Sequence, residues 1–248
     1  MSGEWIWGLH SVEACLENYP ELILELLHDS EMEAGPREKL RSIAKDLGVA
    51  LKEQKKLPGT LADKRTQGIV ARIKSFPLED YKDFEDDFVA GLEEGGKQYA
   101  VLDSLQDPRN YGAIVRSAAA FGISAVIVGR RDQCPPTGIV AQASAGNFFR
   151  VRNVAATNLS RVLERARDVA GDVQVLALDA KGKDLRQLAS QRAGRSWVWV
   201  LGSEGSGLRP GLLSQVTEVV AIPMEPKVES LNASVAGSLA FFTGYSSK

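Results

Sequence analysis

Histidine and cysteine are scarce in this chain of 248 residues, which contains two of each. His10 and His28 both lie in the N-terminal segment, and Cys15 and Cys134 are far apart in the sequence. Two distant cysteines do not form a disulfide framework, and so few His and Cys residues give no zinc-binding pattern. The C-terminal half contains no histidine for a Ser–His or Cys–His pair, which weakens a hydrolase interpretation. We therefore expect a reduced, cytoplasmic protein without a metal site.

Long apolar runs are also missing. No stretch approaches the roughly 20 apolar residues that cross a bilayer, so we expect no membrane-spanning segment. Residues 1–35 contain eight acidic residues and no Lys or Arg, which argues against a signal peptide and against an Arg-rich transit peptide.

Charge is unevenly distributed along the chain, although the net charge is only −2. Residues 36–75 carry eleven basic and four acidic residues, whereas residues 76–97 carry two basic and eight acidic residues. A basic segment of this kind attracts the phosphates of a nucleic acid. On charge alone, a solvated protein surface remains the simpler interpretation.

The composition predicts two α/β domains. The acidic segment ends in Glu93-Glu94-Gly95-Gly96-Lys97, which is typical of a linker. We predict a small domain at 1–75, an acidic linker at 76–97 and a larger domain at 98–248. Within the small domain, the pattern predicts helices at 11–18 and 36–47, with Ser11 as the N-cap of the first, and a strand at 68–73.

Short apolar runs alternate with helical stretches in the larger domain. The predicted strands are 99–102, 125–128, 173–178, 197–201 and 219–222. The predicted helices are 111–121, 138–148, 158–170, 210–216 and 232–245. This alternation predicts a mostly parallel sheet with helices on both faces. Ligands of such sheets bind in loops beyond the carboxyl ends of the strands.

Three of these loops combine glycine with polar residues. The first spans 107–112 and precedes a helix that carries Arg116, the second spans 202–207, and the third spans 228–234. Glycines allow the backbone to approach a ligand closely, and free N–H groups at a helix start favour electron-rich groups. Taken singly, each loop is more simply explained as an ordinary turn or a helix cap.

The spacing of the second loop excludes two common nucleotide-binding motifs. No Lys-Ser or Lys-Thr pair follows Gly207, so the loop is not a Walker A sequence. Pro210 occupies the position of the third glycine of a dinucleotide fingerprint, which disfavours a nucleotide-dependent oxidoreductase. The G-x-S-x-G elbow of α/β-hydrolases is also absent.

Taken together, the three loops resemble the motifs of the SpoU/TrmH family of SPOUT methyltransferases. In chain order the matching residues are Asn110-x-Gly112-x-x-x-Arg116, Gly202-x-Glu204-x-x-Gly207-Leu208, Ile222-Pro223-Met224 and Ser230-Leu231-Asn232-x-Ser234. The N-terminal part resembles the small RNA-binding domain of bacterial 23S ribosomal RNA guanosine 2′-O-methyltransferases, so the resemblance covers nearly the whole chain. Thr66 stands where such domains often have His, which weakens the assignment of the exact RNA target.

This resemblance implies an α/β SPOUT domain with a C-terminal trefoil knot, preceded by a small α/β RNA-binding domain, in a homodimer. The implied reaction transfers a methyl group from S-adenosylmethionine to a ribose 2′-OH of RNA. The implied target is a guanosine of 23S ribosomal RNA. Two alternatives remain open, a tRNA ribose 2′-O-methyltransferase and a non-catalytic RNA-binding or ribosome assembly factor.

The resemblance also implies roles for individual residues. The implied cofactor contacts are Gly202, Gly207, Ile222, Met224 and Leu231, although Met224 fits an ordinary core position equally well. The implied catalytic residues are Asn110, Arg116, Glu204, Ser230 and Asn232. Arg116 would act either as a base or as a cation that stabilises the developing alkoxide, and the high pKa of a guanidinium favours the second role. Leu239, Phe241 and Phe242 are candidates for the dimer interface or for the core.

Overall fold

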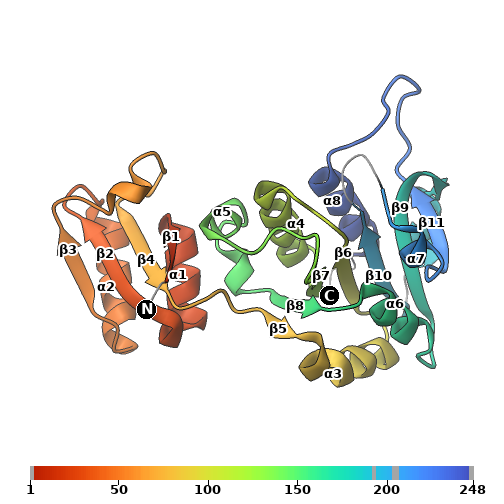
Figure 1. Ribbon diagram of the computed structural model, residues 1–248, viewed down its shortest axis with the longest axis horizontal. Coiled ribbons are helices and arrows are strands. Elements are labelled where there is room, and N and C mark those ends of the chain that lie inside the picture. Colours follow the sequence, from red (N-terminus) through yellow and green to blue (C-terminus); the bar gives the residue numbers. More distant parts are fainter. Residues whose placement is uncertain (1–2, 192–193, 203–206, 246–248) are drawn as a thin grey trace. The chain divides into compact units, whose positions relative to one another are not determined.

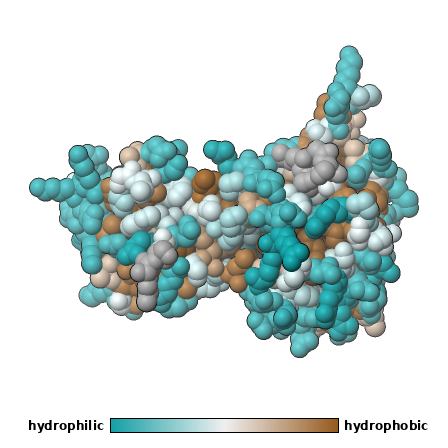
Figure 2. Space-filling view, in the orientation of Figure 1, coloured by the Kyte–Doolittle hydropathy of each residue, from teal (hydrophilic) through white to brown (hydrophobic). Residues whose placement is uncertain are grey.

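The computed structural model describes residues 3–191, 194–202 and 207–245 (Figure 1). The chain divides into two compact units, Met1–Pro77 with Pro135–Arg150, and Leu78–Cys134 with Val151–Lys248. Figure 2 shows the visible faces of both units covered largely by hydrophilic side chains. Among the described residues, no helix combines the length and the apolar character of a bilayer span.

A four-stranded sheet forms the centre of the first unit. Its strand order is β1–β4–β2–β3, with β2 parallel to β3 and the other neighbours antiparallel. The strands are β1 (Glu4–Trp7), β2 (Ile23–Asp29), β3 (Leu51–Gln54) and β4 (Ile69–Ile73), and the helices are α1 (Leu9–Asn18) and α2 (Ala34–Asp46). Trp7, Leu27, Leu61 and Val70 form one buried cluster of this unit.

The segment Pro135–Arg150 belongs to this first unit, although we expected it within the larger domain. It forms α5 (Gly138–Ala143) and the 3-10 turn Asn147–Phe149, not one helix over 138–148. The hydroxyl of Ser11 donates to the carbonyl of Ala141 at 3.0 Å, so Ser11 joins two segments. The predicted role of Ser11 as the N-cap is wrong, because Gly8 occupies that position of α1. Phe148 and Phe149 pack against Phe76, which explains why the segment leaves the second unit.

A seven-stranded sheet, parallel throughout, forms the centre of the second unit, as the alternation of strands and helices predicted. Its order is β11–β9–β10–β6–β7–β8–β5. The strands are β5 (Glu79–Asp80), β6 (Gln98–Leu102), β7 (Ile123–Gly129), β8 (Arg152–Ala156), β9 (Val173–Asp184), β10 (Ser196–Leu201) and β11 (Glu218–Ala221). Every residue of β10 is buried, because helices cover both faces of the sheet.

Helices pack on the two faces of this sheet in separate groups (Figure 1). On one face, α3 (Tyr81–Glu94), α6 (Leu159–Arg167) and α7 (Pro210–Leu213) share a core with buried strand residues such as Val101 and Val198. On the other face, α4 (Pro108–Ala120) and α8 (Ala233–Gly244) pack against each other and against β7 and β10. Trp199 of β10 is fully buried, and its indole N–H donates to the Oε1 of Gln98 at 2.8 Å.

The acidic segment 76–97 is not a linker, which corrects the prediction from composition. It contains β5 and α3, and Phe84, Phe88 and Leu92 of α3 are buried at helical spacing. Its acidic residues serve as ion-pair partners, because Arg152 binds both Glu79 and Asp87. These hydrogen bonds raise the pKa of the Arg152 guanidinium. The prediction from charge was wrong because an amphipathic helix can carry acidic residues on its exposed face while it buries a single apolar face.

Candidate active site

A cavity of about 700 Å³ lies beyond the carboxyl ends of β10 and β11 and beside the middle of β9. It borders the N-terminus of α8, which begins at Ala233. All five predicted cofactor contacts line it, together with two of the predicted catalytic residues: Gly202, Gly207, Ile222, Met224, Leu231, Ser230 and Asn232. Two of the three loops singled out from the sequence therefore meet at one cavity.

An irregularity in β9 forms one wall of this cavity. In the ladder with β11, Val219 pairs with Ala177, but the next residue Val220 pairs with Lys183. The intervening residues 178–182 leave the ladder, and Leu178, Asp179 and Ala180 among them line the cavity. Such bulges re-aim side chains near functional sites. Asp179 places a carboxylate in the wall, and sequence analysis did not single it out.

The glycines at 202 and 207 are required by the close approach of their backbones. A Cβ atom on Gly202 would lie 2.6 Å from the carbonyl carbon of Gly207 and 2.8 Å from the nitrogen of Leu208. Gly207 has φ +67°, which L side chains rarely adopt. The two segments can therefore approach this closely only because residue 202 is a glycine. Glu204, the predicted catalytic carboxylate between them, lies outside the described residues.

Asn232 joins the third motif to the first. Its side-chain oxygen accepts from the backbone N–H of Ser234 at 2.9 Å, so Asn232 is the N-cap of α8. Its amide nitrogen donates to the Oδ1 of Asn110 at 3.0 Å. Further along the two helices, the hydroxyls of Ser117 and Ser238 lie 2.6 Å apart. A polar seam between α4 and α8 therefore fixes Asn110 beside the cavity.

Arg116 occupies a different place from the other predicted site residues. It is exposed on α4 and is not among the residues that line the cavity. It makes no hydrogen bond or salt bridge with any residue that the structure describes. The structure thus brings together Asn110, Ser230 and Asn232, whereas Arg116 projects from the helix beside them.

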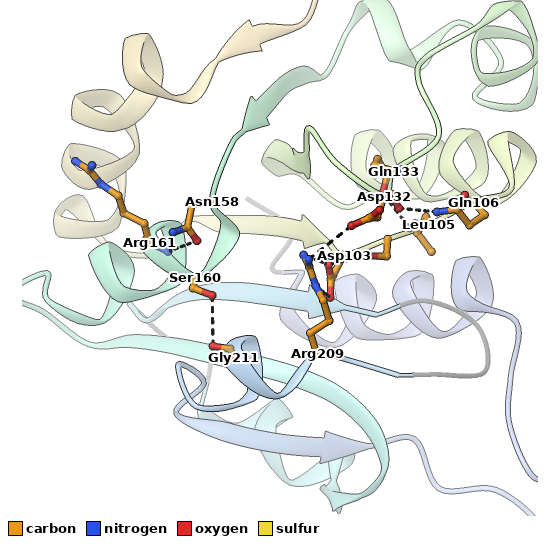
Figure 3. Close-up of polar contacts among 11 residues, drawn as sticks. Asp103, Leu105, Gln106, Asp132, Gln133, Asn158, Ser160, Arg161, Arg209 and Gly211 are labelled. Atoms are coloured by element: carbon orange, nitrogen blue, oxygen red, sulfur yellow. Dashed lines mark hydrogen bonds and ion pairs between the residues drawn. The ribbon is translucent and has the colours of Figure 1, made fainter.

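An ion pair between a buried carboxylate and a half-exposed guanidinium was missed by sequence analysis. Asp103 follows β6 and is 1% exposed, and both its carboxylate oxygens accept from the guanidinium of Arg209, at 2.5 and 3.1 Å (Figure 3). The carboxylate of Asp103 raises the pKa of Arg209. A polar residue directly after a buried strand was the only available signal, and its partner lies far along the chain.

The described residues contain no group of three or more His, Cys, Asp or Glu side chains that would hold a metal ion.

Two family models match the chain and together cover most of it. The model of the SpoU rRNA methylase family matches residues 97–242, and the model of RNA 2′-O ribose methyltransferase substrate binding matches residues 5–78. The chain belongs to the SpoU rRNA methylase family. The resemblance inferred from the three motifs is thereby confirmed.

Two curated relatives match nearly the whole length of the chain. It is 32% identical to the 23S rRNA (guanosine-2′-O-)-methyltransferase RlmB of Acinetobacter baylyi, over 96% of this chain and 95% of the relative. It is 30% identical to RlmB of Vibrio vulnificus, over 98% of this chain and 96% of the relative. These SpoU relatives thus align with both parts of the chain.

Solved structures share the fold. The SpoU methyltransferase AviRb from Streptomyces viridochromogenes, in complex with AdoMet, superposes with a TM-score of 0.77 at 22% identity, over 97% of this chain and 88% of that one. The AdoMet-bound rRNA methyltransferase from Sinorhizobium meliloti gives 0.74 at 22% identity, over 98% and 86%. The predicted fold class, a SPOUT α/β domain with a small α/β domain before it, is confirmed by this likeness.

Membership of the family makes this protein an S-adenosylmethionine-dependent RNA ribose 2′-O-methyltransferase. The residues present fit such a cofactor. The cavity volume of about 700 Å³ falls in the range of roughly 300–1,000 Å³ that small-molecule sites occupy. Gly202 and Gly207 contribute only backbone atoms to its lining.

Proposed function

We propose that this SpoU enzyme methylates the ribose 2′-OH of a guanosine in 23S ribosomal RNA, in the cytoplasm. The observation that carries the proposal is the single cavity at which the second and third motifs meet, with Asn110 of the first motif bonded to Asn232 at its edge. The choice of RNA rests on the two RlmB relatives, which align with both parts of the chain.

Five residues form the proposed cofactor seat. Gly202 and Gly207 offer backbone groups without side chains, and Ile222, Met224 and Leu231 add apolar surface. Apolar walls with a few placed polar groups are typical of small-molecule sites. When bound there, S-adenosylmethionine supplies the methyl group. Ser230 and Asn232 line the same cavity, and we propose that with Asn110 they shape the place where the ribose docks.

Arg116 is the proposed stabiliser of the reacting 2′-oxygen. A hydroxyl is a weak nucleophile, so its reaction needs a base or a cation beside the developing alkoxide. A guanidinium normally stays protonated, which favours the cationic role. Its exposed position on α4 leaves the side chain accessible to an RNA phosphate. We propose that Glu204 orients it.

A homodimer formed through α8 is proposed from an apolar stripe on that helix. Val235, Leu239 and Phe242 are 46%, 41% and 61% exposed. Their spacing of four and three residues places them on one face of the helix. Phe241 is fully buried and belongs to the core, so it drops out of the proposed interface. A second copy of this chain would cover the three exposed side chains.

The first unit is the proposed RNA-docking domain, and the second unit is the proposed methyltransferase domain. Lys55 and Lys56 follow β3, and Arg65 precedes β4. Because β3 runs parallel to β2 and β4 runs antiparallel to it, these segments meet at the same end of the sheet. The three side chains are exposed and form no salt bridge with described residues. They are the cations that we expect to face RNA phosphates.

A C-terminal trefoil knot is the proposed topology of the methyltransferase domain, as the family resemblance implies. The proposal rests on the order of the three motifs and on the match of the SpoU family model to residues 97–242.

Methyl transfer from labelled S-adenosylmethionine to RNA tests the proposed function. The substrate is ribosomal RNA from a strain that lacks the enzyme, and tRNA from the same strain is the control. We expect one ribose methylation at a guanosine of 23S RNA. Label in tRNA alone would show that tRNA is the substrate instead of 23S RNA. Cofactor binding without methyl transfer to either RNA would favour a non-catalytic assembly factor.

A further inference from the structure

Asp103 binds both chain segments that flank the two cavity glycines. Its backbone N–H donates to the carbonyl of Leu201 at 2.8 Å, directly before Gly202. Its carboxylate accepts from the Nε and Nη2 atoms of Arg209, two residues after Gly207. Figure 3 shows the guanidinium of Arg209 reaching across to Asp103 beyond the end of the strand. One buried residue thus ties the chain before the first glycine to the chain after the second.

The surroundings hold the Asp103 carboxylate in one orientation. The hydroxyl of Ser104 donates to its Oδ1 at 3.0 Å. Ser104 has φ +61°, an uncommon backbone conformation for a residue other than glycine. Asp132 lies 4.0 Å from the Nη1 of Arg209 and adds a second negative charge on the outer side of the guanidinium. A planar guanidinium held by two parallel hydrogen bonds has little freedom to shift.

The burial of the two partners is unequal. The side chain of Asp103 is 1% exposed, whereas that of Arg209 is 52% exposed. Removal of Arg209 leaves a buried carboxylate without its cation, which is strongly destabilising. Removal of the Asp103 charge leaves an arginine that water can solvate. Removing the Arg209 cation alone should therefore lower stability more than neutralising Asp103 does. This difference lets an effect on stability be separated from an effect on loop geometry.

We propose that Asp103 and Arg209 are positioning residues that hold Gly202 and Gly207 at the spacing that binds S-adenosylmethionine. The inference rests on the proposed cofactor seat. Neither residue is among those lining the cavity, so the pair acts through the backbone of the two glycines. The pair is thus a clamp on the cofactor wall, in addition to any contribution that it makes to stability.

The test measures cofactor affinity and thermal stability separately in the full-length protein. Arg209→Lys keeps the cation but loses the paired hydrogen bonds. The double variant Asp103→Asn with Arg209→Gln removes the buried charge and its partner together. We expect both to melt near the wild-type temperature and to bind S-adenosylhomocysteine about tenfold more weakly by calorimetry, the size of effect that the loss of one hydrogen bond causes. The KM for S-adenosylmethionine should rise while kcat at saturation stays near wild type.

Arg186→Lys is the matched control, because Arg186 also binds an aspartate, Asp184, through two nitrogens but is 76% exposed. We expect it to bind the cofactor as the wild type does. Wild-type affinity in a stable Arg209→Lys protein would overturn the clamp and leave an ordinary structural ion pair. Failure of the wild-type protein itself to bind S-adenosylhomocysteine would instead overturn the proposed cofactor seat.

Discussion

Asn232 donates a hydrogen bond of 3.0 Å to Asn110, across 122 positions of sequence. The same side chain caps α8 through its oxygen, so one residue serves both the helix and the site. The helix cap and the third motif therefore coincide at Asn232. The two roles can be separated, because serine also caps helices but is too short to reach Asn110.

Asn232→Ser should keep the cap and lose the contact with Asn110. We expect its stability to stay close to wild type and its single-turnover rate to fall about tenfold, the equivalent of one hydrogen bond. Asn232→Ala should lose a comparable rate and also about 1 kcal/mol of stability. Thermal melts and methyl-transfer rates check both variants. An unimpaired rate in the Ser variant would reduce Asn232 to a cap.

Arg116→Ala should lower turnover by at least about 100-fold, the low end for loss of a base or an oxyanion donor. Cofactor affinity should survive, since Arg116 does not line the cavity. Single-turnover transfer at saturating RNA measures the first quantity, and calorimetry measures the second. Strong activity in Arg116→Lys would leave Arg116 as a phosphate anchor and exclude the general-base role. Near-wild-type turnover in the Ala variant would transfer the proposed role to Glu204.

Gly202→Ala should impair cofactor binding, because the added methyl would lie 2.6 Å from the carbonyl carbon of Gly207. Overpacking of this kind costs about 1–3 kcal/mol, so we expect affinity to fall by about 5- to 150-fold. Gly35→Ala is the control, since nothing lies within 4 Å of its new methyl. Calorimetry with S-adenosylhomocysteine compares the two. Equal affinity in both variants would show that the wall tolerates a side chain.

Phe242→Asp should convert a dimer into a monomer if α8 pairs with a second copy. The wild-type protein should sediment at about twice the chain mass of 26.8 kDa. The charge would be buried without a partner in the interface, which is strongly unfavourable. Leu47→Asp is the control, because Leu47 is 42% exposed but lies in the first unit. A wild-type protein that sediments only as single chains would contradict the proposed dimer.

Cys15 should resist alkylation in the folded protein, while Cys134 reacts first. Burial, with a smaller contribution from Glu21, raises the pKa of Cys15 from 9.0 to about 12, so its reactive thiolate is scarce at pH 8. Because the fold favours the protonated thiol, this stabilisation is complete below pH 9.0 and is lost as pH rises towards 12. Mass spectrometry after iodoacetamide treatment checks the order. Alkylation of Cys15 first would contradict it.

RNA affinity should depend on the cations at one end of the first sheet. Exchanging Lys55, Lys56 and Arg65 for glutamine should weaken rRNA binding and flatten its dependence on salt, because each lost phosphate contact removes counterion release. Deletion of residues 1–75 is a poorer test, since Pro135–Arg150 packs in the same unit and would be uncovered. Binding titrations over a range of salt check the variant. Unchanged affinity and slope would mean that these side chains only face solvent.

The sequence by itself determined the features that depend on local pattern. Alternating apolar runs and helices predicted the parallel sheet, since burial on both faces imposes continuous apolar strands. The three motifs predicted the family, and the residues of the second and third converge on the cavity. Local charge was less informative, because the acidic segment 76–97 hides the apolar face of α3.

Only the tertiary structure decided which distant residues meet. Asp103 and Arg209 are 106 positions apart, and they become partners because β6 and β10 are neighbours in the sheet. Residues 135–150 joined the first unit through contacts with α1 and β1 that no periodicity reveals. Periodicity reports which face of an element is buried, whereas strand order decides what lies opposite. Pairing across the fold is therefore set by the global packing of the whole chain and cannot be read from any one segment.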